Sequence, residues 1–306
     1  MAIDPATRIS LDARARSSAP IEEILMQTDV AIIGGGLSGL SLARHLEDAG
    51  TDYIVFEARD RFGGRIFTES ISQAAINLGP SWFWPGQHRM ERLVKEWGLA
   101  TFTQYSSGGA VFEHPDGRVE SVMRFASMQG SWLLVGGTCQ IIQSLLATLP
   151  RDRLLTGHAA SRITQAGEIS FANGTICKAK RIVLALPSRV AATMAFDPAL
   201  PQEALQAMEA IPTWMAGHAK LFATYKEPFW REQGLSGEGF SRRGPLAEIH
   251  DTSPADSNAS GALFGFLGVP AQQRRGHDEA VIKACLAQLG RMFGEIACEP
   301  FIRTGP

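Results

Sequence analysis

The sequence predicts an α/β fold with a dinucleotide-binding βαβ unit near its start and a second region of mixed strands and helices behind it. A short all-apolar run at 30–33 is typical of a strand buried on both faces of a parallel sheet. Apolar residues then recur at helical spacing from Leu37 to Leu46, Gly50 ends that helix, and 53–56 is a second apolar run. A strand, a helix and a strand in this order predict a right-handed parallel crossover.

Periodicity predicts most of the remaining elements. Helices are expected where apolar residues repeat every three or four positions, at 88–97, 141–149 and 278–293. Strands are expected at 160–164, 168–171, 181–186, around Lys220 and at 262–268, with a hairpin turn at 114–118. The stretch 234–261 is rich in Gly, Ser and Asp, so we expect a loop there.

Composition indicates an ordinary globular protein. The 306 residues are 45% hydrophobic and 20% charged, with a net charge of −2, so no basic surface suggests nucleic acid or an anionic membrane as a partner. No apolar run is long enough to span a membrane. Residues 1–27 lack an apolar signal core, so we expect a flexible lead-in and a cytoplasmic protein.

The four cysteines predict neither a disulfide framework nor a metal site. They are scattered, with no CxxC pair and no histidine cluster at ligand spacing, which fits a reducing compartment. We expect all four to be small buried hydrophobic residues.

A glycine-rich turn follows the first predicted strand. Gly34-x-Gly36-x-x-Gly39 is positioned so that backbone N–H groups and the helix N-terminus, including Leu37 and Ser38, can meet a pyrophosphate. Such a turn alone is weak evidence, because glycine-rich turns are common. Glu57 at the end of the next strand stands where a ribose-binding acid is expected, which favours a dinucleotide site.

A second basic and glycine-rich tract favours FAD over nicotinamide cofactors. Glu57 would repel a 2′-phosphate, which argues against NADP. The tract Arg59-x-Arg61-x-Gly63-Gly64-Arg65 offers backbone access and guanidinium groups that suit the pyrophosphate of FAD. Taken singly, it is equally well explained as a basic surface turn.

The sequence as a whole resembles the flavin-containing monoamine and polyamine oxidases. The resemblance runs from about residue 28 to the C-terminus, and its most specific parts are LALP at 184–187 and KLFATYKEPFW at 220–230. It implies a GR2-type flavoprotein: a Rossmann-like FAD-binding domain and a mixed-sheet substrate domain, interleaved in sequence. The implied FAD-binding domain covers 28–100 and 134–205, and the implied substrate domain covers 101–133 and 206–306.

The resemblance also implies site residues. The implied contacts to the ADP part of FAD are Gly34, Gly36, Leu37, Ser38, Gly39, Glu57, Ala58, Arg59, Gly63, Gly64, Arg65 and, near the adenine, Ala160. The implied neighbours of the flavin ring are Gly79, Pro80, Ser81 and Trp82. Pro80 replaces a glycine that the family usually has, so a backbone N–H is lost there.

Lys220 is the implied catalytic residue, aligned with the lysine that holds a water against flavin N5. On an alternating strand it shares a face with Phe222 and Thr224, and burial would lower its pKa. Without the resemblance, a lysine extending from a strand edge to solvent is the simpler interpretation. We expect His218 to be a packed or capping histidine.

Two departures from the family pattern remain. Residues 124–131 stand where the family has a helical substrate region, and the chain is expected to lack the later segment that closes over the flavin and carries the aromatic cage. The resemblance implies a FAD-dependent oxidase that transfers a hydride from a small amine to flavin N5, with oxygen as the second substrate. The alternatives are a non-catalytic or incomplete flavin-binding module and a flavin desaturase. No general base stands out in the sequence.

Overall fold

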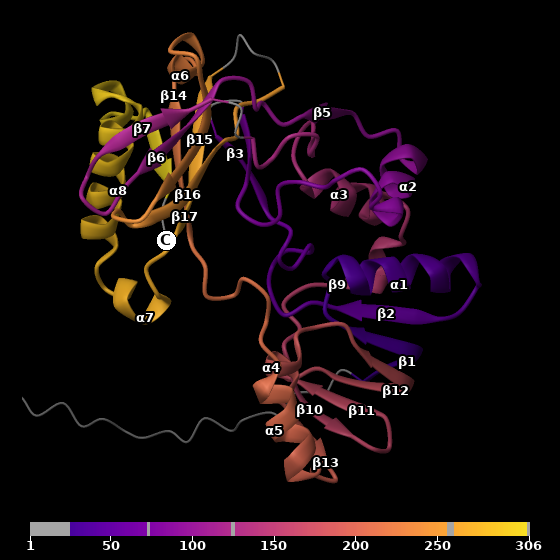
Figure 1. Cartoon of the computed structure of the whole chain (residues 1–306). Helices are drawn as coiled ribbons and strands as arrows, with labels where there is room; N and C mark the ends of the chain where they lie inside the picture. The colour runs from indigo at the N-terminus through magenta and orange to yellow at the C-terminus, as the bar shows by residue number, and fades with distance from the viewer. Residues whose placement is uncertain (1–24, 72–73, 124–125, 256–259, 305–306) are drawn as a thin grey trace, which may run out of the picture.

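The computed structural model describes residues 25–71, 74–123, 126–255 and 260–304. Most of the predicted lead-in, residues 1–24, lies outside this part of the chain, and its last three residues belong to the first strand. Two seven-stranded sheets dominate the described residues, one at each end of the molecule (Figure 1). The chain passes from the first sheet to the second, returns, and then ends in the second.

The first sheet contains the predicted βαβ unit. Its strands, in spatial order, are β13 (Ala195–Asp197), β10 (Ala160–Thr164), β11 (Glu168–Phe171), β12 (Ile176–Leu184), β1 (Leu25–Ile33), β2 (Tyr53–Phe56) and β9 (Leu154–Leu155). The four strands from β12 to β9 run parallel, while β11 pairs antiparallel with both of its neighbours. This mixed α/β arrangement confirms the predicted fold class.

The second sheet is mainly antiparallel. Its strands, in spatial order, are β18 (Ile302–Thr304), β14 (Lys220–Tyr225), β17 (Gly261–Leu267), β16 (Leu246–Asp251), β15 (Leu235–Ser241), β6 (Gly109–Glu113) and β7 (Val119–Val122). Two small hairpins pair β3 (Thr68–Ile71) with β4 (Ala74–Asn77), and β5 (Thr101–Thr103) with β8 (Trp132–Leu134). The predicted turn at 114–118 joins β6 to β7.

The longer helices are α1 (Leu37–Asp48), α2 (His88–Glu96), α3 (Cys139–Ala147), α5 (Gln202–Ala210) and α8 (Asp278–Phe293). The short ones are α4 (Ser188–Ala191), α6 (Phe229–Glu232), α7 (Ala271–Arg274) and the 3₁₀ turns η1 (Arg151–Arg153) and η2 (Glu295–Cys298). Four of the longer helices, α1, α2, α3 and α8, lie where apolar periodicity predicted them, whereas α5 and the short helices were not predicted.

Each sheet has its own hydrophobic core. In the first, α1 and α3 pack Leu40 and Leu145 against β1 and β2. In the second, α8 covers one face and buries Leu289 and Phe293 against Leu221 of β14 (Figure 1). Each such side chain contributes about 1.5–3 kcal/mol by leaving water. The packing of α8 leaves the opposite face of this sheet for another set of side chains.

The predicted loop at 234–261 is wrong over most of its length, because 235–241 and 246–251 form β15 and β16. Gly234 has a positive φ and lies in a turn, whereas Gly239 lies within β15 and contributes to close packing. A Cβ at Gly239 would lie 3.0 Å from Met292 of α8, and one at Gly265 in β17 would lie 3.0 Å from Leu246. A Cβ at either position would force the neighbouring side chain to shift, so glycine fits the close approach of α8 and the adjacent strand to the backbone.

Candidate functional site

The turn between β1 and α1 is closely packed around its glycines. Gly34 has a φ of +114°, and a Cβ there would lie 2.6 Å from the carbonyl oxygen of Ala185. A Cβ at Gly39 would lie 2.0 Å from the carbonyl oxygen of Gly34. Any larger residue at these positions would push the helix away from the strand, so the sequence motif corresponds to a real steric requirement.

The second glycine tract lies directly on this turn. Gly36 and Gly63 form a β-bridge, and a Cβ at Gly64 would lie 3.2 Å from Cα of Gly36. Arg61 holds the tract in place: its guanidinium donates a 3.1 Å hydrogen bond to the carbonyl of Gly64 and lies 4.2 Å from the ring centre of Phe67. Two motifs far apart in the sequence therefore present one continuous backbone surface.

Glu57 ends β2 beside that surface. It is 7% exposed, and its two carboxylate oxygens accept hydrogen bonds from the N–H groups of Gly35 at 2.8 Å and Arg59 at 3.0 Å. Each carboxylate oxygen keeps a further lone pair, so the side chain can also accept hydrogen bonds from ribose hydroxyls. Ala58, which follows it, is exposed.

The turn has the chemistry that a dinucleotide requires. Helix α1 begins at Leu37 after Gly36, with no side-chain cap and no acidic residue in its first turn, so its N–H groups remain available to an anion. The side chains of Arg59 and Arg65 are exposed nearby in sequence. These residues fit a pyrophosphate, with Glu57 for the ribose.

Ala160 opens β10 close to the end of β2. The segment that leads into it is held there by the N–H groups of Gly157 and His158, which donate to the carbonyl oxygens of Arg59 and Glu57, both at 2.9 Å. The predicted adenine-side residue therefore lies near the predicted ribose-side residue.

The predicted flavin-side segment 79–82 packs against the second glycine tract. A Cβ at Gly79 would lie 2.1 Å from the carbonyl oxygen of Arg65. Pro80 lacks an N–H, but its carbonyl accepts a 3.0 Å hydrogen bond from Thr138. Trp82 donates a 2.9 Å hydrogen bond from its indole to Gln104. The segment thus leads from the backbone surface formed by residues 34–39 and 63–65, here called the glycine surface, toward the second sheet.

Lys220 extends from β14 to this segment. Its Nζ donates to the carbonyl oxygen of Gly79 at 2.6 Å and to Oγ of Ser81 at 3.2 Å. It also lies 4.8 Å from the ring centre of Phe264 and 5.2 Å from that of Phe266. Burial lowers its pKa to about 8. Lys220 is therefore not a strand-edge side chain that extends into solvent.

The alternation predicted for β14 agrees with the structure, whereas the expectation for His218 does not. Phe222 lies in a cluster with Ile76 and Phe264, while Leu221 and Ala223 lie in the core under α8. The side chain of His218 is exposed rather than packed.

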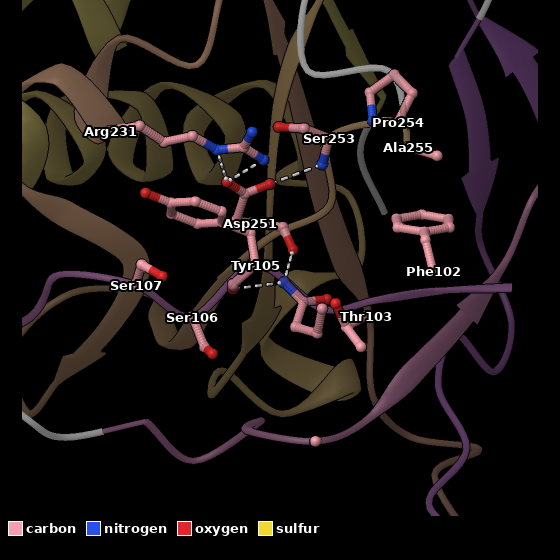
Figure 2. Close-up of a pocket in the computed structure, with 12 residues that line it drawn as sticks. Phe102, Thr103, Tyr105, Ser106, Ser107, Arg231, Asp251, Ser253, Pro254 and Ala255 are labelled. Carbon is pink, nitrogen blue, oxygen red and sulfur yellow. Dashed lines mark hydrogen bonds and ion pairs between the residues drawn. The ribbon is translucent and has the colours of Figure 1, made fainter.

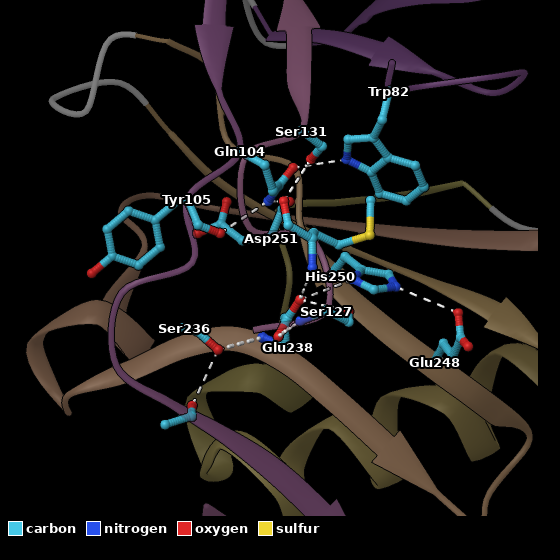
Figure 3. Close-up of polar contacts among 12 residues, drawn as sticks. Trp82, Gln104, Tyr105, Ser127, Ser131, Ser236, Glu238, Glu248, His250 and Asp251 are labelled. Carbon is cyan, nitrogen blue, oxygen red and sulfur yellow. Dashed lines mark hydrogen bonds and ion pairs between the residues drawn. The ribbon is translucent and has the colours of Figure 1, made fainter. Parts of the chain in front are cut away.

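Sequence reasoning missed the polar residues of β15 and β16 because it assigned them to a loop. Glu238 and His250 are almost fully buried, and both lie on the sheet face opposite α8 with Phe264 (Figure 3). A buried charged residue within alternating apolar positions, as in GEGF or EIHD, was the available signal.

A cavity of about 330 Å³ is lined by residues that include Gln104, Tyr105, Arg231 and Asp251 (Figure 2). The guanidinium of Arg231 lies over the ring of Tyr105 at 4.0 Å and pairs with Asp251 at 2.9 Å. Gln104 donates to the carbonyl of Asp251 at 2.5 Å and accepts from the indole of Trp82. One amide side chain therefore connects this cavity to the predicted flavin-side segment.

The cysteines are all free, but they do not share one environment. Cys177 and Cys285 are buried as predicted, and burial raises their pKa values to about 11 and about 12. Cys298 is exposed and Cys139 is half-buried, so the prediction that all four are buried is wrong. Within the described ranges, no group of three or more potential ligands is arranged to hold a metal ion. None of the helices in that same part of the chain is long and apolar enough to cross a membrane.

Comparison with known proteins identifies the family. The family model described as flavin containing amine oxidoreductase matches residues 37–132 and 120–303. The chain belongs to the flavin-containing amine oxidoreductases. As a member of this family it is a FAD-dependent oxidoreductase, and the flavin-binding-module and desaturase hypotheses are not favoured.

Relatives of this amine oxidoreductase are distant but cover most of it. A putrescine oxidase of Kocuria rosea is 23% identical over 400 positions, covering 92% of this chain and 82% of the relative. The flavin-containing amine oxidase B of Sus scrofa is 25% identical to this chain. The alignment covers 78% of this chain and 65% of the relative. The 400 aligned positions exceed the 306 residues here, so the putrescine oxidase contains internal segments for which this chain has no counterpart.

Solved structures show the same fold. A wild-type putrescine oxidase bound to putrescine has a TM-score of 0.79 at 22% identity, covering 92% of this chain and 85% of the other. Cyclohexylamine oxidase from Brevibacterium oxydans IH-35A has a TM-score of 0.80 at 19% identity, covering 91% and 84%. The two-sheet architecture is therefore that of the amine oxidases.

Proposed function

We propose that this chain oxidises a small primary amine, with FAD as cofactor and oxygen as the second substrate. The chemistry that FAD supplies when bound is acceptance of a hydride from the amine-bearing carbon, followed by reoxidation with oxygen to give peroxide. Two relatives act on putrescine and cyclohexylamine by their names, so small amines of both kinds are the first candidates.

The observation that carries the proposal is the position of Lys220. Segment 79–82 packs on the glycine tract at Arg65, and Nζ of Lys220 donates to Gly79 within this segment. A single path of contacts therefore links the nucleotide-binding turn to a buried amine on the second sheet. No such path is required of a purely structural lysine.

The residues proposed to hold FAD divide into two groups. Backbone groups from Gly34 to Gly39 and from Gly63 to Arg65 would hold the pyrophosphate, Glu57 the ribose, and the segment before Ala160 the adenine. Segment 79–82 would face the flavin ring, and Lys220 holds a proton at Nζ beside this segment. With a pKa lowered to about 8, Lys220 can both donate and accept a proton near neutral pH.

We also propose the domain division and the location predicted from the sequence. The strands of the first sheet lie within 25–56 and 154–197, which supports a FAD-binding domain of 28–100 and 134–205. The strands of the second sheet support a substrate domain of 101–133 and 206–306. The free cysteines support a cytoplasmic location.

Anaerobic reduction tests the proposed activity. The full chain is purified, loaded with FAD and mixed without oxygen with primary amines, diamines and amino acids. We expect at least one amine to bleach the visible flavin absorption, and readmission of oxygen to restore it with formation of peroxide. If FAD binds and no compound bleaches it, the proposed activity is wrong.

A further inference from the structure

The ammonium group of Lys220 is fully engaged by the segment 77–82. Its Nζ donates to the carbonyl oxygen of Gly79 at 2.6 Å, to Oγ of Ser81 at 3.2 Å and to the carbonyl oxygen of Asn77 at 3.4 Å. An ammonium has three N–H bonds and no lone pair, so three acceptors match its three donors. A water molecule bound to Nζ would have to displace one of them.

Ser81 differs from the two carbonyl acceptors because it carries a proton of its own. Its side chain is 3% exposed, and among the described residues the hydrogen-bond partner of its Oγ is Nζ of Lys220. A hydroxyl that accepts from an ammonium directs its own O–H bond elsewhere. Buried hydroxyls normally have an acceptor. The proton of Ser81 is therefore available to a group that is not one of the described residues.

Helix α3 holds the segment around Ser81 in place. The carbonyl of Pro80 accepts a 3.0 Å hydrogen bond from Oγ1 of Thr138, which directly precedes α3. The side chain of Asn77 accepts a 2.9 Å hydrogen bond from the N–H of Thr138. The proline ring restricts the backbone further. The hydroxyl is therefore held against Nζ by a fixed segment.

The other neighbours of Nζ cannot pass a proton on. Nζ lies 4.8, 5.2 and 5.8 Å from the ring centres of Phe264, Phe266 and Phe222. These rings attract a cation but have no exchangeable proton, and the same is true of the two carbonyl groups. Among the described residues that contact Nζ, Ser81 alone can accept one proton and release another.

The titratable groups nearest to this face lie behind the aromatic rings. The ring of His250 faces Phe264 and Phe266 at 5.5 and 6.4 Å between centres. Its two nitrogens are 3.6 Å from Glu248 and 4.0 Å from Glu238. The carboxylates favour a positive charge on Lys220 from a distance, but in the described part of the chain no carboxylate pairs with Nζ. The hydrogen bonds from segment 77–82 are therefore its direct support.

The charge of Lys220 decides which way the Ser81 hydroxyl points. While Nζ carries three protons, it donates to Oγ, and the O–H bond of Ser81 points away from it. A neutral amine has two N–H bonds and a lone pair, so the hydroxyl can turn and donate to Nζ. A proton that leaves the far side of Ser81 can therefore be replaced from Lys220 on the near side.

We propose that Ser81 relays a proton from Lys220 to reduced oxygen, an assignment that rests on the proposed oxidation of an amine with oxygen as the second substrate. Oxygen that has gained two electrons and one proton is the hydroperoxide anion, which needs one more proton to become hydrogen peroxide. The O–H bond of Ser81 breaks, its electron pair stays on Oγ, and its proton bonds to that anion. One N–H bond of Lys220 breaks in the same step, its electron pair stays on Nζ, and its proton forms the new O–H bond of Ser81.

The relay lets a lysine that is fully engaged by its own protein serve a reaction that it does not touch. The products of the step are hydrogen peroxide, an intact serine and a neutral lysine. Burial lowers the pKa of Lys220 to about 8, so near neutral pH the neutral lysine takes up a proton from solvent again. Ser81 is thus the group that positions this proton for use.

Lysine NMR of the full chain tests the contact without catalysis. The pH titration of the Lys220 ¹³Cε signal, assigned by its loss in Lys220→Met, gives the pKa of Lys220. In Ser81→Ala the ammonium loses an acceptor, so this pKa should fall by about one unit. Ser81→Thr retains the hydroxyl and should restore the wild-type pKa. An unchanged pKa in Ser81→Ala overturns the proposal.

Two further variants complete the NMR test. Ser236→Ala removes another buried hydroxyl of the second sheet and is the matched control, in which the pKa of Lys220 should not change. Ser81→Cys is nearly the same size as the wild type and carries a weaker acceptor. It should lower the pKa of Lys220 in the same direction, and it replaces Ser81→Ala if the alanine variant does not fold.

Reoxidation of flavin tests the relay itself. The FAD-loaded protein is reduced by titration with dithionite, so no amine is needed, and is then mixed with oxygen in a stopped-flow instrument. Ser81→Ala should slow reoxidation about tenfold to a hundredfold and lower by about one unit the pH above which the rate falls. The double variant Ser81→Ala/Lys220→Met should be no slower than Lys220→Met, because both residues lie on one path.

The outcomes separate this proposal from the proposed activity. Effects of Ser81→Ala and Lys220→Met that multiply in the double variant overturn the relay, because independent residues act additively in free energy. Failure of every amine to reduce the wild-type flavin overturns the proposed activity instead. The dithionite experiment and the lysine titration remain readable in that case.

Discussion

The glycine surface of the first sheet and the polar face of the second sheet are built in opposite ways. The first consists of backbone groups brought together by the absence of side chains at Gly36, Gly39 and Gly64. The second consists of side chains from four separate strands, β14, β15, β16 and β17, which lie between residues 220 and 267. A backbone surface can be read from a local motif, whereas a side-chain surface exists only once the strands have paired.

Loss of a glycine should have the largest effect, because it breaks the backbone surface itself. In Gly39→Ala the new Cβ would lie 2.0 Å from the carbonyl of Gly34, so the helix must move. We expect a loss of about 3 kcal/mol or more in the free energy of unfolding, and loss of bound FAD. Urea unfolding and flavin absorbance measure both.

The matched control for that change is Gly217→Ala. Gly217 has open space where a Cβ would be placed and no positive φ. We expect unchanged FAD content and a change in unfolding free energy within about 0.5 kcal/mol. Equal effects in the two variants would mean that close packing is not what the motif provides.

Lys220→Met tests the side-chain surface while sparing the backbone surface. Removal of a positioned proton donor should slow flavin reoxidation by oxygen about a hundredfold, with FAD binding retained. In the wild type the rate should fall as pH rises through about 8, where the lysine loses its proton. Stopped-flow reoxidation measures this, and a wild-type rate that does not depend on pH would remove Lys220 from the reaction.

Comparison of the wild type with Lys220→Met should also reveal an effect of pH on the free energy of unfolding. The lysine has a pKa of about 8 in the folded state and 10.5 ordinarily, so the unfolded chain binds more protons between these values. The stability of the wild type relative to Lys220→Met should therefore rise with pH from about 8 to 10.5. Comparing unfolding at pH 7.5 and 10 provides the measurement.

Ser127→Ala should have the smallest effect. It removes one of the hydrogen bonds to Glu238, while the N–H groups of Ser127 and Met128 remain. We expect a loss of about 1 kcal/mol in the free energy of unfolding. The exposed Ser107→Ala is the control, and an equal change in both variants would contradict a special role for the Glu238 contacts.

Much of the first sheet could be predicted because its signals are local. The bounds predicted for the strands at 53–56, 160–164 and 168–171 are those of the structure. Hydrophobic runs, helical spacing and the glycine turn all depend on residues close together in the chain. Lys220 and Gly79, although 141 residues apart, could be related only through the family resemblance.

The second sheet was predicted less well because its glycines have two possible meanings. Gly237, Gly239 and Gly261 suggested a loop by composition, yet they admit the side chains of Trp230 and Met292 and the backbone at Glu227. Composition cannot distinguish a glycine that bends the chain from one that lets another element approach. That error hid His250 and its two carboxylate neighbours.

The contact between Gly36 and Gly64 has a consequence for protein engineering. A Cβ at Gly64 would lie 3.2 Å from Cα of Gly36, so each residue forms part of the space that the other needs. Anyone transplanting this nucleotide-binding turn into another scaffold would have to move both stretches together. The smallest transferable unit is therefore a pair of segments, 34–39 and 61–65. It includes Arg61, whose hydrogen bond to the carbonyl of Gly64 stabilises the second segment.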